Sequence, residues 1–249
     1  MRLLVSLFFL FIAFNLQAQT LLNDNFDGST LNGALWDTFT SSLTPAGTTG
    51  AVYLSNGNLI LVNRGTIITK QAFNTPFDIS SNFRIEGNYD RVGIFLRTTG
   101  SSTNPWKDQD NGIFINFQQD TYGDFSKRWI GIAEWSVGGL NNLTGGYTND
   151  PNTYYKQLAT TSANIPSNTL LNYRITDDGY NIAVYLGNLT TPILTASTSF
   201  SPGNRVAFNN GYSGNQISID SIQIVPEPSA LSLLAVGLGG LAMMRRRRS

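Results

Sequence analysis

Short runs of β-prone residues recur at close intervals along most of the chain, and this pattern constrains the fold more than any other feature. From Gln19 onward, clusters of Gly, Asn, Ser and Thr separate the runs. Such spacing predicts an antiparallel all-β fold. No segment of this body keeps a helical period over a dozen residues. The expected strands are 51–54, 59–63, 66–73, 82–89, 92–98, 112–118, 128–136, 170–176, 182–186, 206–209 and 216–224.

Two stretches add detail to this pattern. Asp177-Asp178-Gly179 joins two expected strands, and Asp-Gly supplies the positive φ angles of a tight hairpin turn. The run 216–224 alternates as one strand, with Ile217 and Ile219 on one face and Ile222 and Ile224 on the other. By contrast, the polar segment 141–168 predicts a long loop with one short β segment, and such loops often carry binding function.

The absence of cysteine and histidine removes several chemistries. The 249-residue chain contains neither residue type. It can therefore form no disulfide, no thiol nucleophile, no Ser-His-Asp triad and no zinc site of the usual kind. A metal would have to be held by oxygen ligands alone, which favours calcium.

Both ends of the chain predict export. Arg2 and the apolar segment 3–14, followed by Ala18 at the expected cleavage point, are typical of a secretory signal peptide over residues 1–18. An uncleaved N-terminal anchor is the alternative. Removing both end segments leaves residues 19–225, enough for one sandwich or barrel.

The last stretch combines two prolines, an uncharged apolar run and an arginine cluster. Val225-Pro226-Glu227-Pro228 precedes the segment 229–244, and Arg245, Arg246, Arg247 and Arg248 follow it. A single transmembrane helix is expected here, although residues 230–244 would span only about 23 Å of a bilayer core of about 30 Å. The arginines should stay cytoplasmic, which places everything before Pro226 outside. A buried amphipathic helix with a solvated basic end is the alternative.

The order of Pro-Glu-Pro, apolar helix and arginine cluster resembles the PEP-CTERM sorting tail of Gram-negative bacterial surface proteins. The resemblance implies export by the general secretion machinery, recognition by an exosortase, cleavage near Pro226, Glu227 and Pro228, and transfer to the cell surface or extracellular matrix. The short span and the two prolines favour a transient anchor. Residues 226–249 are accordingly assigned to the tail.

The net charge of zero conceals a difference between the body and its ends. Arg2 and the four terminal arginines are five of 16 basic residues, and Glu227 is one of 16 acidic residues. The body therefore carries 11 basic and 15 acidic residues, a net charge of about −4. Nucleic-acid binding is not expected, because it calls for a basic patch.

The body carries a second resemblance. Four stretches of the body are similar, in this order, to concanavalin A-like and laminin G-like jelly rolls. They are residues 25–32 with Trp36, the segment Asn56-Gly57-Asn58-Leu59-Ile60-Leu61, the Asp177-Asp178-Gly179 hairpin and the closing Ile219-Asp220-Ser221-Ile222. The resemblance implies a two-sheet antiparallel sandwich. Members of the family include lectins, adhesive modules and polysaccharide hydrolases.

The polysaccharide hydrolases of this jelly-roll family, of laminarinase type, require two carboxylates that flank the glycosidic bond. Its Glu-x-Asp-x-x-Glu signature is not found, and the nearest candidate is Glu134 in Ala133-Glu134-Trp135-Ser136-Val137. One carboxylate cannot serve both as nucleophile and as general acid, so Glu134 is interpreted as a binding or structural residue.

Three aspartates predict a structural calcium site. Asp24 and Asp27 lie at the first expected strand and Asp220 in the last, which jelly rolls commonly place side by side. Their carboxylates could share one Ca²⁺ with backbone carbonyls. The alternative is that Asp24 and Asp27 initiate a turn while Asp220 is solvated.

Aromatic residues gather in the middle of the chain, among amides and acids. Sugar rings can dock their C–H faces on aromatic planes, and sheet cores use the same residues. Trp36 and Trp129 are expected in the core, whereas the candidate glycan-binding residues are Trp106, Trp135, Tyr147, Tyr154 and Tyr155.

Together these patterns predict an exported, exosortase-sorted protein whose sandwich binds polysaccharide without catalysis, as part of an exopolysaccharide or biofilm matrix. Two alternatives stay open: a glycoside hydrolase or lyase with a divergent site, and a purely structural adhesin.

Overall fold

The computed structural model describes residues 21–40, 50–87, 89–99, 111–120, 128–137, 153–211 and 216–226. These residues contain sixteen β-strands and no helix, and every strand pair is antiparallel. The predicted all-β fold with two antiparallel sheets is confirmed. Residues 1–18 and 229–244, expected as signal peptide and membrane helix, lie outside the described residues, among which no helix is long and apolar enough to cross a bilayer.

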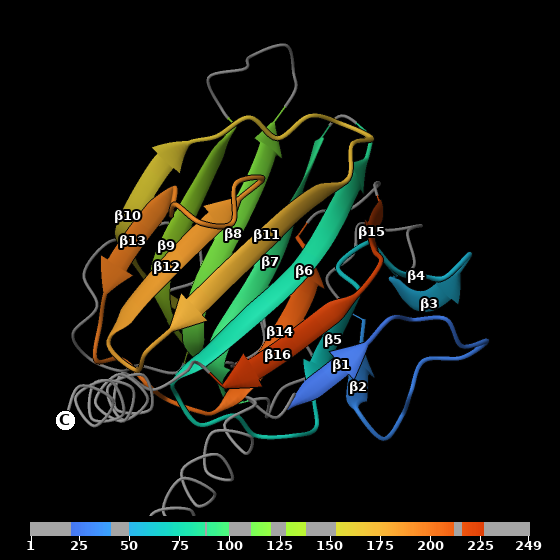
Figure 1. The fold of residues 1–249 in the computed structure, drawn as a ribbon, viewed down its shortest axis with the longest axis horizontal. Coiled ribbons are helices and arrows are strands. Elements are labelled where there is room, and N and C mark those ends of the chain that lie inside the picture. Colours follow the sequence, from blue (N-terminus) through green and yellow to red (C-terminus); the bar gives the residue numbers. More distant parts are fainter. Residues whose placement is uncertain are drawn as a thin grey trace, which may run out of the picture.

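The two sheets stack as front and back layers (Figure 1). The first sheet consists of β13 (Leu194–Ser197), β12 (Asn181–Leu186), β11 (Leu171–Asp177), β6 (Phe77–Glu86), β15 (Gln216–Ile219), β4 (Asn58–Val62) and β3 (Ala51–Ser55), with β16 (Ile222–Pro226) between β6 and β1 (Leu22–Asp24). The second consists of β10 (Thr153–Ser162), β9 (Trp129–Val137), β8 (Gly112–Asp120), β7 (Tyr89–Thr98), β14 (Arg205–Asn210), β5 (Thr66–Thr69) and β2 (Trp36–Phe39).

The main core lies between the sheets. Because successive side chains of a strand point to opposite faces, each strand contributes alternate residues to it. At its centre, the ring of Phe83 (β6) lies 5.1 Å from that of Phe117 (β8), and both pack on Tyr173 (β11). Trp36 is 2 % exposed and belongs to this core, as expected.

The last predicted strand is not continuous. Ser218 is in register with Arg84 of β6, but Ile222 is in register with Ser81, so Asp220 and Ser221 together oppose Asn82. This is a β-bulge, and the extra residue reverses which face the following side chains occupy. Ile219 and Ile222 are therefore both fully buried. The prediction of one uninterrupted strand was wrong because a bulge allows both isoleucine pairs to reach the same core.

Three further strands were not predicted, and a fourth, β10, is longer than predicted. β1, β2 and β13 have three or four residues each. β10 extends over ten residues, where a mostly polar loop was expected. It is an edge strand that pairs only with β9, so its Thr, Ser and Gln side chains meet water, and its sequence lacks the apolar alternation of a core strand.

A buried ion pair connects the two sheets near the hairpin of β11 and β12. Arg97 adopts a positive φ of 51° beside a register shift between β7 and β14, which directs its side chain inward. Arg97 Nε donates to Asp177 Oδ2 (2.8 Å), and Nη2 pairs with Asp177 Oδ1. Arg97 Nη1 donates to the carbonyls of Thr198 and Phe200.

The predicted hairpin turn comes immediately after Asp177 in the chain. Gly179 has a φ of +99°, and its N–H donates to Asp177 Oδ1 (2.9 Å).

Candidate functional site

The outer side of β8, β9 and β10 carries a row of polar side chains beside the half-buried Trp129. Ile130 and Ile132 of β9 are fully buried in the main core, so Trp129 and Gly131 point to the outer side. Gln118 and Asn116 of β8 are in register with them on one side, and Ser162 and Thr160 of β10 on the other. We call this surface the Trp129 face, defined by Asn116, Gln118, Trp129, Gly131, Gln157, Thr160 and Ser162.

The Trp129 face contains an open hollow of about 440 Å³, lined by Trp129, Gln157, Thr160, Thr161 and Ser162. A Cβ atom on Gly131 would overlap Cζ3 of Trp129 and lie 3.0 Å from Nε2 of Gln157. The indole and the amide therefore lie directly over the backbone of Gly131. Gln157 Nε2 donates to Ile132 O (2.9 Å), which holds the amide against the sheet. The hollow thus presents an aromatic ring flanked by amide and hydroxyl groups.

Trp129 corrects one prediction. It was expected in the core, but its side chain is half-buried and lines the hollow. The signal that could have identified it is Gly131, two residues further on the same face, which leaves room for the indole to lie against the strand.

Trp135 lies on the same side of the second sheet but is only 6 % exposed. Its indole packs edge-on against Phe95 and Phe114, with ring centroids 6.5 and 5.8 Å away. Ile68 and Ala207 complete this second apolar cluster, which is separate from the main core. In the described structure, Trp135 belongs to this apolar cluster and is almost fully buried.

The other four aromatic candidates lie partly or wholly outside the described residues. Tyr154 and Tyr155 lie in β10, in register with Ser136 and Trp135 of β9. Their side chains lie outside the described part of the chain, as do Trp106 and Tyr147 entirely.

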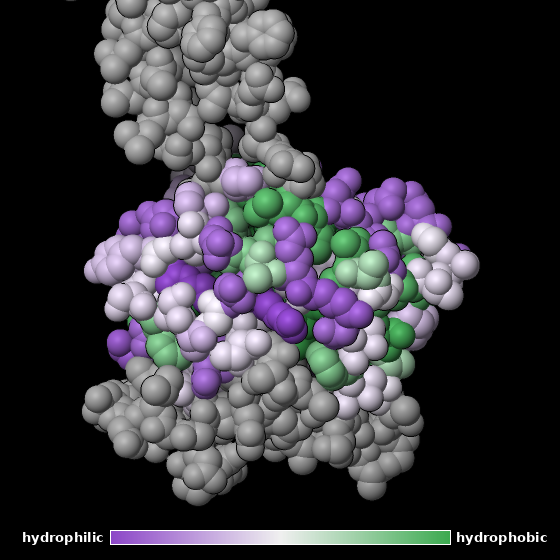
Figure 2. Space-filling view, turned by 90° about the horizontal axis from the view of Figure 1, so that it is seen from below, coloured by the Kyte–Doolittle hydropathy of each residue, from purple (hydrophilic) through white to green (hydrophobic). Residues whose placement is uncertain are grey.

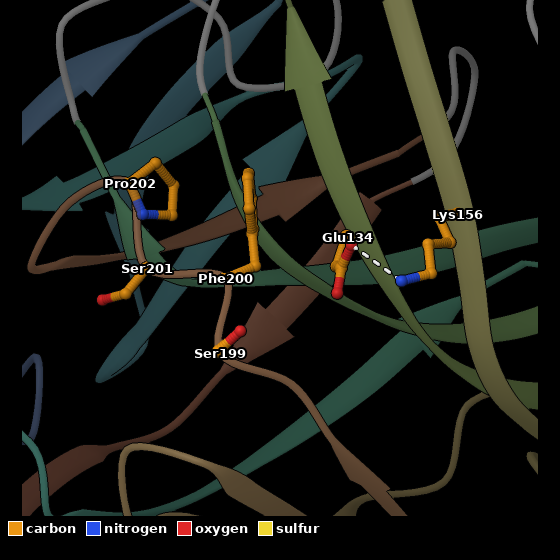
Figure 3. Close-up of a pocket in the computed structure, with 6 residues that line it drawn as sticks. All are labelled: Glu134, Lys156, Ser199, Phe200, Ser201 and Pro202. Carbon is orange, nitrogen blue, oxygen red and sulfur yellow. Dashed lines mark hydrogen bonds and ion pairs between the residues drawn. The ribbon is translucent and has the colours of Figure 1, made fainter. Parts of the chain in front are cut away.

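Glu134 faces the opposite way, toward the gap between the sheets. Its Oε1 accepts a hydrogen bond from Thr198 Oγ1 (2.6 Å), and its Oε2 lies 3.4 Å from Lys156 Nζ. The carboxylate is 7 % exposed and Lys156 is 47 % exposed. Together with the segment 199–202, they line a hollow of about 450 Å³ (Figure 3).

This second hollow, the Glu134 pocket, has one carboxylate in its lining: Glu134, Lys156, Ser199, Phe200, Ser201 and Pro202. In Figure 3 the Lys156 side chain points at Glu134, while the residues of the 199–202 segment lie across from it. Glycoside hydrolysis by the two-carboxylate route requires a second acid about 5 Å or more away. Within the described lining, Glu134 has a cation as its neighbour instead.

The three aspartates proposed as calcium ligands lie near one end of the first sheet. β1 does pair with β16, as expected. Asp24 accepts hydrogen bonds from Phe26 N (3.0 Å) and Trp36 Nε1 (2.7 Å), which occupy both of its oxygens. Asp27 accepts from Asn25 Nδ2, and Asp220 from Asn82 Nδ2 (3.3 Å). Among the described residues, no three acidic side chains are grouped to hold a metal ion.

The proposed sorting residues begin at the end of the sandwich. Pro226 is the last residue of β16. Glu227, Pro228 and Arg245–Arg248 lie outside the described residues.

The end of the sandwich at the bottom of Figure 1 is a mixed surface, with apolar residues gathered among hydrophilic ones (Figure 2).

Comparison with known proteins gives one sequence match and many similar structures. The PEP-CTERM protein-sorting motif matches residues 225–248. No curated protein matches the sequence. A protein of unknown function with a galectin-like fold from Bacillus subtilis has a TM-score of 0.59 at 10 % identity, over 84 % of this chain and 97 % of that chain.

Two functionally described proteins have the same fold. The VIP36 exoplasmic/lumenal domain in its metal-free form has a TM-score of 0.57 at 14 % identity, over 77 % of this chain and 84 % of that chain. The same domain has also been solved with Ca²⁺/Man3GlcNAc bound. The catalytic domain of an endo-1,3-beta-glucanase (laminarinase) from Thermotoga petrophila RKU-1 has a TM-score of 0.54 at 12 % identity, over 84 % and 98 % of the two chains.

At such identities the similarity concerns the fold alone. The chain therefore carries a PEP-CTERM protein-sorting motif at residues 225–248. This motif follows a sandwich of the galectin-like, concanavalin A-like jelly-roll type in the sequence.

Proposed function

We propose that this protein is exported in a Gram-negative bacterium, sorted by an exosortase to the cell surface or extracellular matrix, and binds polysaccharide on the Trp129 face without catalysis. The sorting motif supports the destination. The observation that carries the binding role is the half-buried indole of Trp129, which lies over Gly131 beside the amide of Gln157 in an open polar hollow.

This arrangement suits a sugar ring. A pyranose has an apolar C–H face, which an aromatic plane can cover, and hydroxyl groups, which need donors and acceptors at the rim. The Trp129 face supplies both within three neighbouring strands. Neutral glycans are favoured over polyanionic ones, because the body has a net charge of about −4.

The test is glycan binding by residues 19–226 of the wild type and of two site variants. Trp129→Ala should weaken binding about tenfold or more, which corresponds to at least about 1.4 kcal/mol. Gly131→Val should weaken it too, because the new side chain displaces the indole. Tyr180→Ala is the matched control: Tyr180 is 58 % exposed on the β11–β12 hairpin of the other sheet. Unchanged binding by a folded Trp129→Ala variant would contradict the proposal.

Three aromatic side chains outside the described part of the chain belong to the same test. Trp106→Ala, Tyr147→Ala and Tyr155→Ala measure whether neighbouring side chains extend the glycan surface, as predicted from the sequence. If no polysaccharide binds at all, the structural adhesin is the better interpretation.

The hydrolase or lyase alternative is tested separately, through the Glu134 pocket. Release of reducing ends or unsaturated products from a polysaccharide panel, abolished by Glu134→Gln, would establish catalysis. The glutamine can still accept the Thr198 hydrogen bond, so loss of activity in this variant would report the carboxylate and not the local packing.

A structural calcium ion stays a prediction, supported only by the Ca²⁺-bound form of one structural neighbour. An ion bound to the folded state raises its stability by linkage. A melting temperature that does not change when a chelator is added would rule the ion out.

A further inference from the structure

The sorting motif and the sandwich overlap by two residues. The motif match begins at Val225, and β16 ends at Pro226. Val225 is in register with Asp78 of β6, and Pro226 with Phe77. Both residues are half-buried. The start of the processing signal is therefore also part of a paired strand.

Among the described residues, this end of β16 has one paired neighbouring strand where the rest of the strand has two. The described register with β1 ends at the pair Leu22 and Ile224, and Leu21 N donates to Ile224 O (2.9 Å). Beyond that point the described pairing partner is β6. Pro226 has no N–H group and cannot donate a ladder hydrogen bond. Strand ends with few hydrogen bonds open at a small fraction of the free energy of global unfolding.

The covalent distance to the apolar segment is short. Glu227, Pro228 and Ser229 separate β16 from Ala230, where the uncharged run begins. Fully extended, this connection spans at most about 14 Å from Pro226 to Ala230. An enzyme that binds an extended peptide usually contacts residues on both sides of the bond it cuts. Residues on the N-terminal side of Glu227 are engaged with β6 and cannot make such contacts while paired.

We propose that Val225 and Pro226 must separate from β6 before the exosortase can process the motif, so that strand pairing at the end of β16 limits the rate of sorting. The opening is local. Ile222 and Ile224 are fully buried and stay in the core, and the bulge at Asp220 and Ser221 is unaffected. This inference rests on the sorting part of the proposed function and is independent of glycan binding.

The test uses the absence of cysteine from the natural chain. In the double variant Asp78→Cys/Val225→Cys, directly opposed residues of an antiparallel pair can form a disulfide in the oxidising exported compartment. The variant is expressed as the full chain in a host that processes PEP-CTERM proteins, and loss of the tail is followed by pulse-chase and immunoblot. The oxidised form should accumulate unprocessed, and added reductant should restore processing.

Two controls separate the effect of the cross-link from other effects. Ser80→Cys/Gln223→Cys cross-links the same strands two residues upstream, in register on the same face, and should be processed like the wild type. Asp78→Cys alone removes the ion pair between Asp78 and Arg174 (2.6 Å) without a cross-link, and should also be processed.

A second variant keeps the proposal falsifiable if the disulfide impairs folding. Insertion of Gly-Ser-Gly-Ser-Val-Pro after Pro226 keeps β16 intact and repeats the motif start beyond a flexible spacer. Processing should become several-fold faster than in the wild type. Equal rates for the oxidised Asp78→Cys/Val225→Cys form and its upstream control would overturn the proposal. If the wild type is not processed at all, both this inference and the sorting role fail, whereas glycan binding is unaffected.

Discussion

The buried pair of Arg97 and Asp177 should dominate the stability of one end of the sandwich. Their side chains are 2 % and 0 % exposed and belong to different sheets. In Asp177→Asn, the amide oxygen can accept one guanidinium hydrogen bond and can keep the bond from Gly179 N, but the compensating charge is lost. Removing one partner of a buried ion pair costs about 3–5 kcal/mol, because the other charge stays buried. We therefore expect a loss near the lower end of this range.

The measurement is urea unfolding of residues 19–226, followed by tryptophan fluorescence. For a domain of this size, 3 kcal/mol lowers the melting temperature by roughly 6–12 °C. The exposed pair of Lys70 and Asp37 (3.4 Å) supplies a matched control, since both side chains are more than one-third exposed. Asp37→Asn should cost at most about 1 kcal/mol, because water screens this pair.

The coupling can be measured directly. Arg97→Met/Asp177→Asn removes the buried charge together with its partner, so its loss should be smaller than the sum of the two single losses. Equal costs for Asp177→Asn and Asp37→Asn, or simple additivity in the double variant, would refute the idea that the uncompensated guanidinium is the main penalty.

Two pH-dependent effects are expected from other side chains. Burial raises the pKa of Tyr173 above its usual range. The unfolded chain loses the Tyr173 proton at a lower pH than the folded chain does. The free energy of unfolding is therefore at its full value below pH 10 and decreases as the pH rises beyond 10. Tyr173→Phe should flatten this alkaline decrease, at little or no cost in stability near pH 7. Hydrogen bonds from Asn181, first from its backbone N–H, lower the pKa of Asp178 below its ordinary value of 3.8. The Asp178 carboxylate therefore stabilises the folded state above pH 3.8, and this stabilisation is lost as the pH falls below 3.8. In Asp178→Ala, the free energy of unfolding should depend less on pH between about pH 2 and 5.

The sequence predicted the parts of this fold that depend on local pattern. Short β-prone runs between turn residues identified β4, β7, β8 and β9. The Asp178-Gly179 turn needed only its own residue types, because a positive φ is a local requirement. The sorting motif is likewise a linear signal, and the absence of histidine and cysteine excludes their chemistry in any fold.

The tertiary structure decided what depends on sheet order and register. A period of two assigns residues to two faces without saying which face is buried, so Trp129 could be placed on the outer side only after Ile130 and Ile132 were seen in the core. The bulge at Asp220 and Ser221 forms against Asn82, which lies 138 residues away, so the local sequence does not reveal it. Arg97 and Asp177, 80 residues apart, are joined only when two sheets stack. Local pattern thus determined the central strands, the hairpin and the sorting motif of the chain. The non-local contacts between strands decided where its tryptophan, its buried charges and the end of β16 lie.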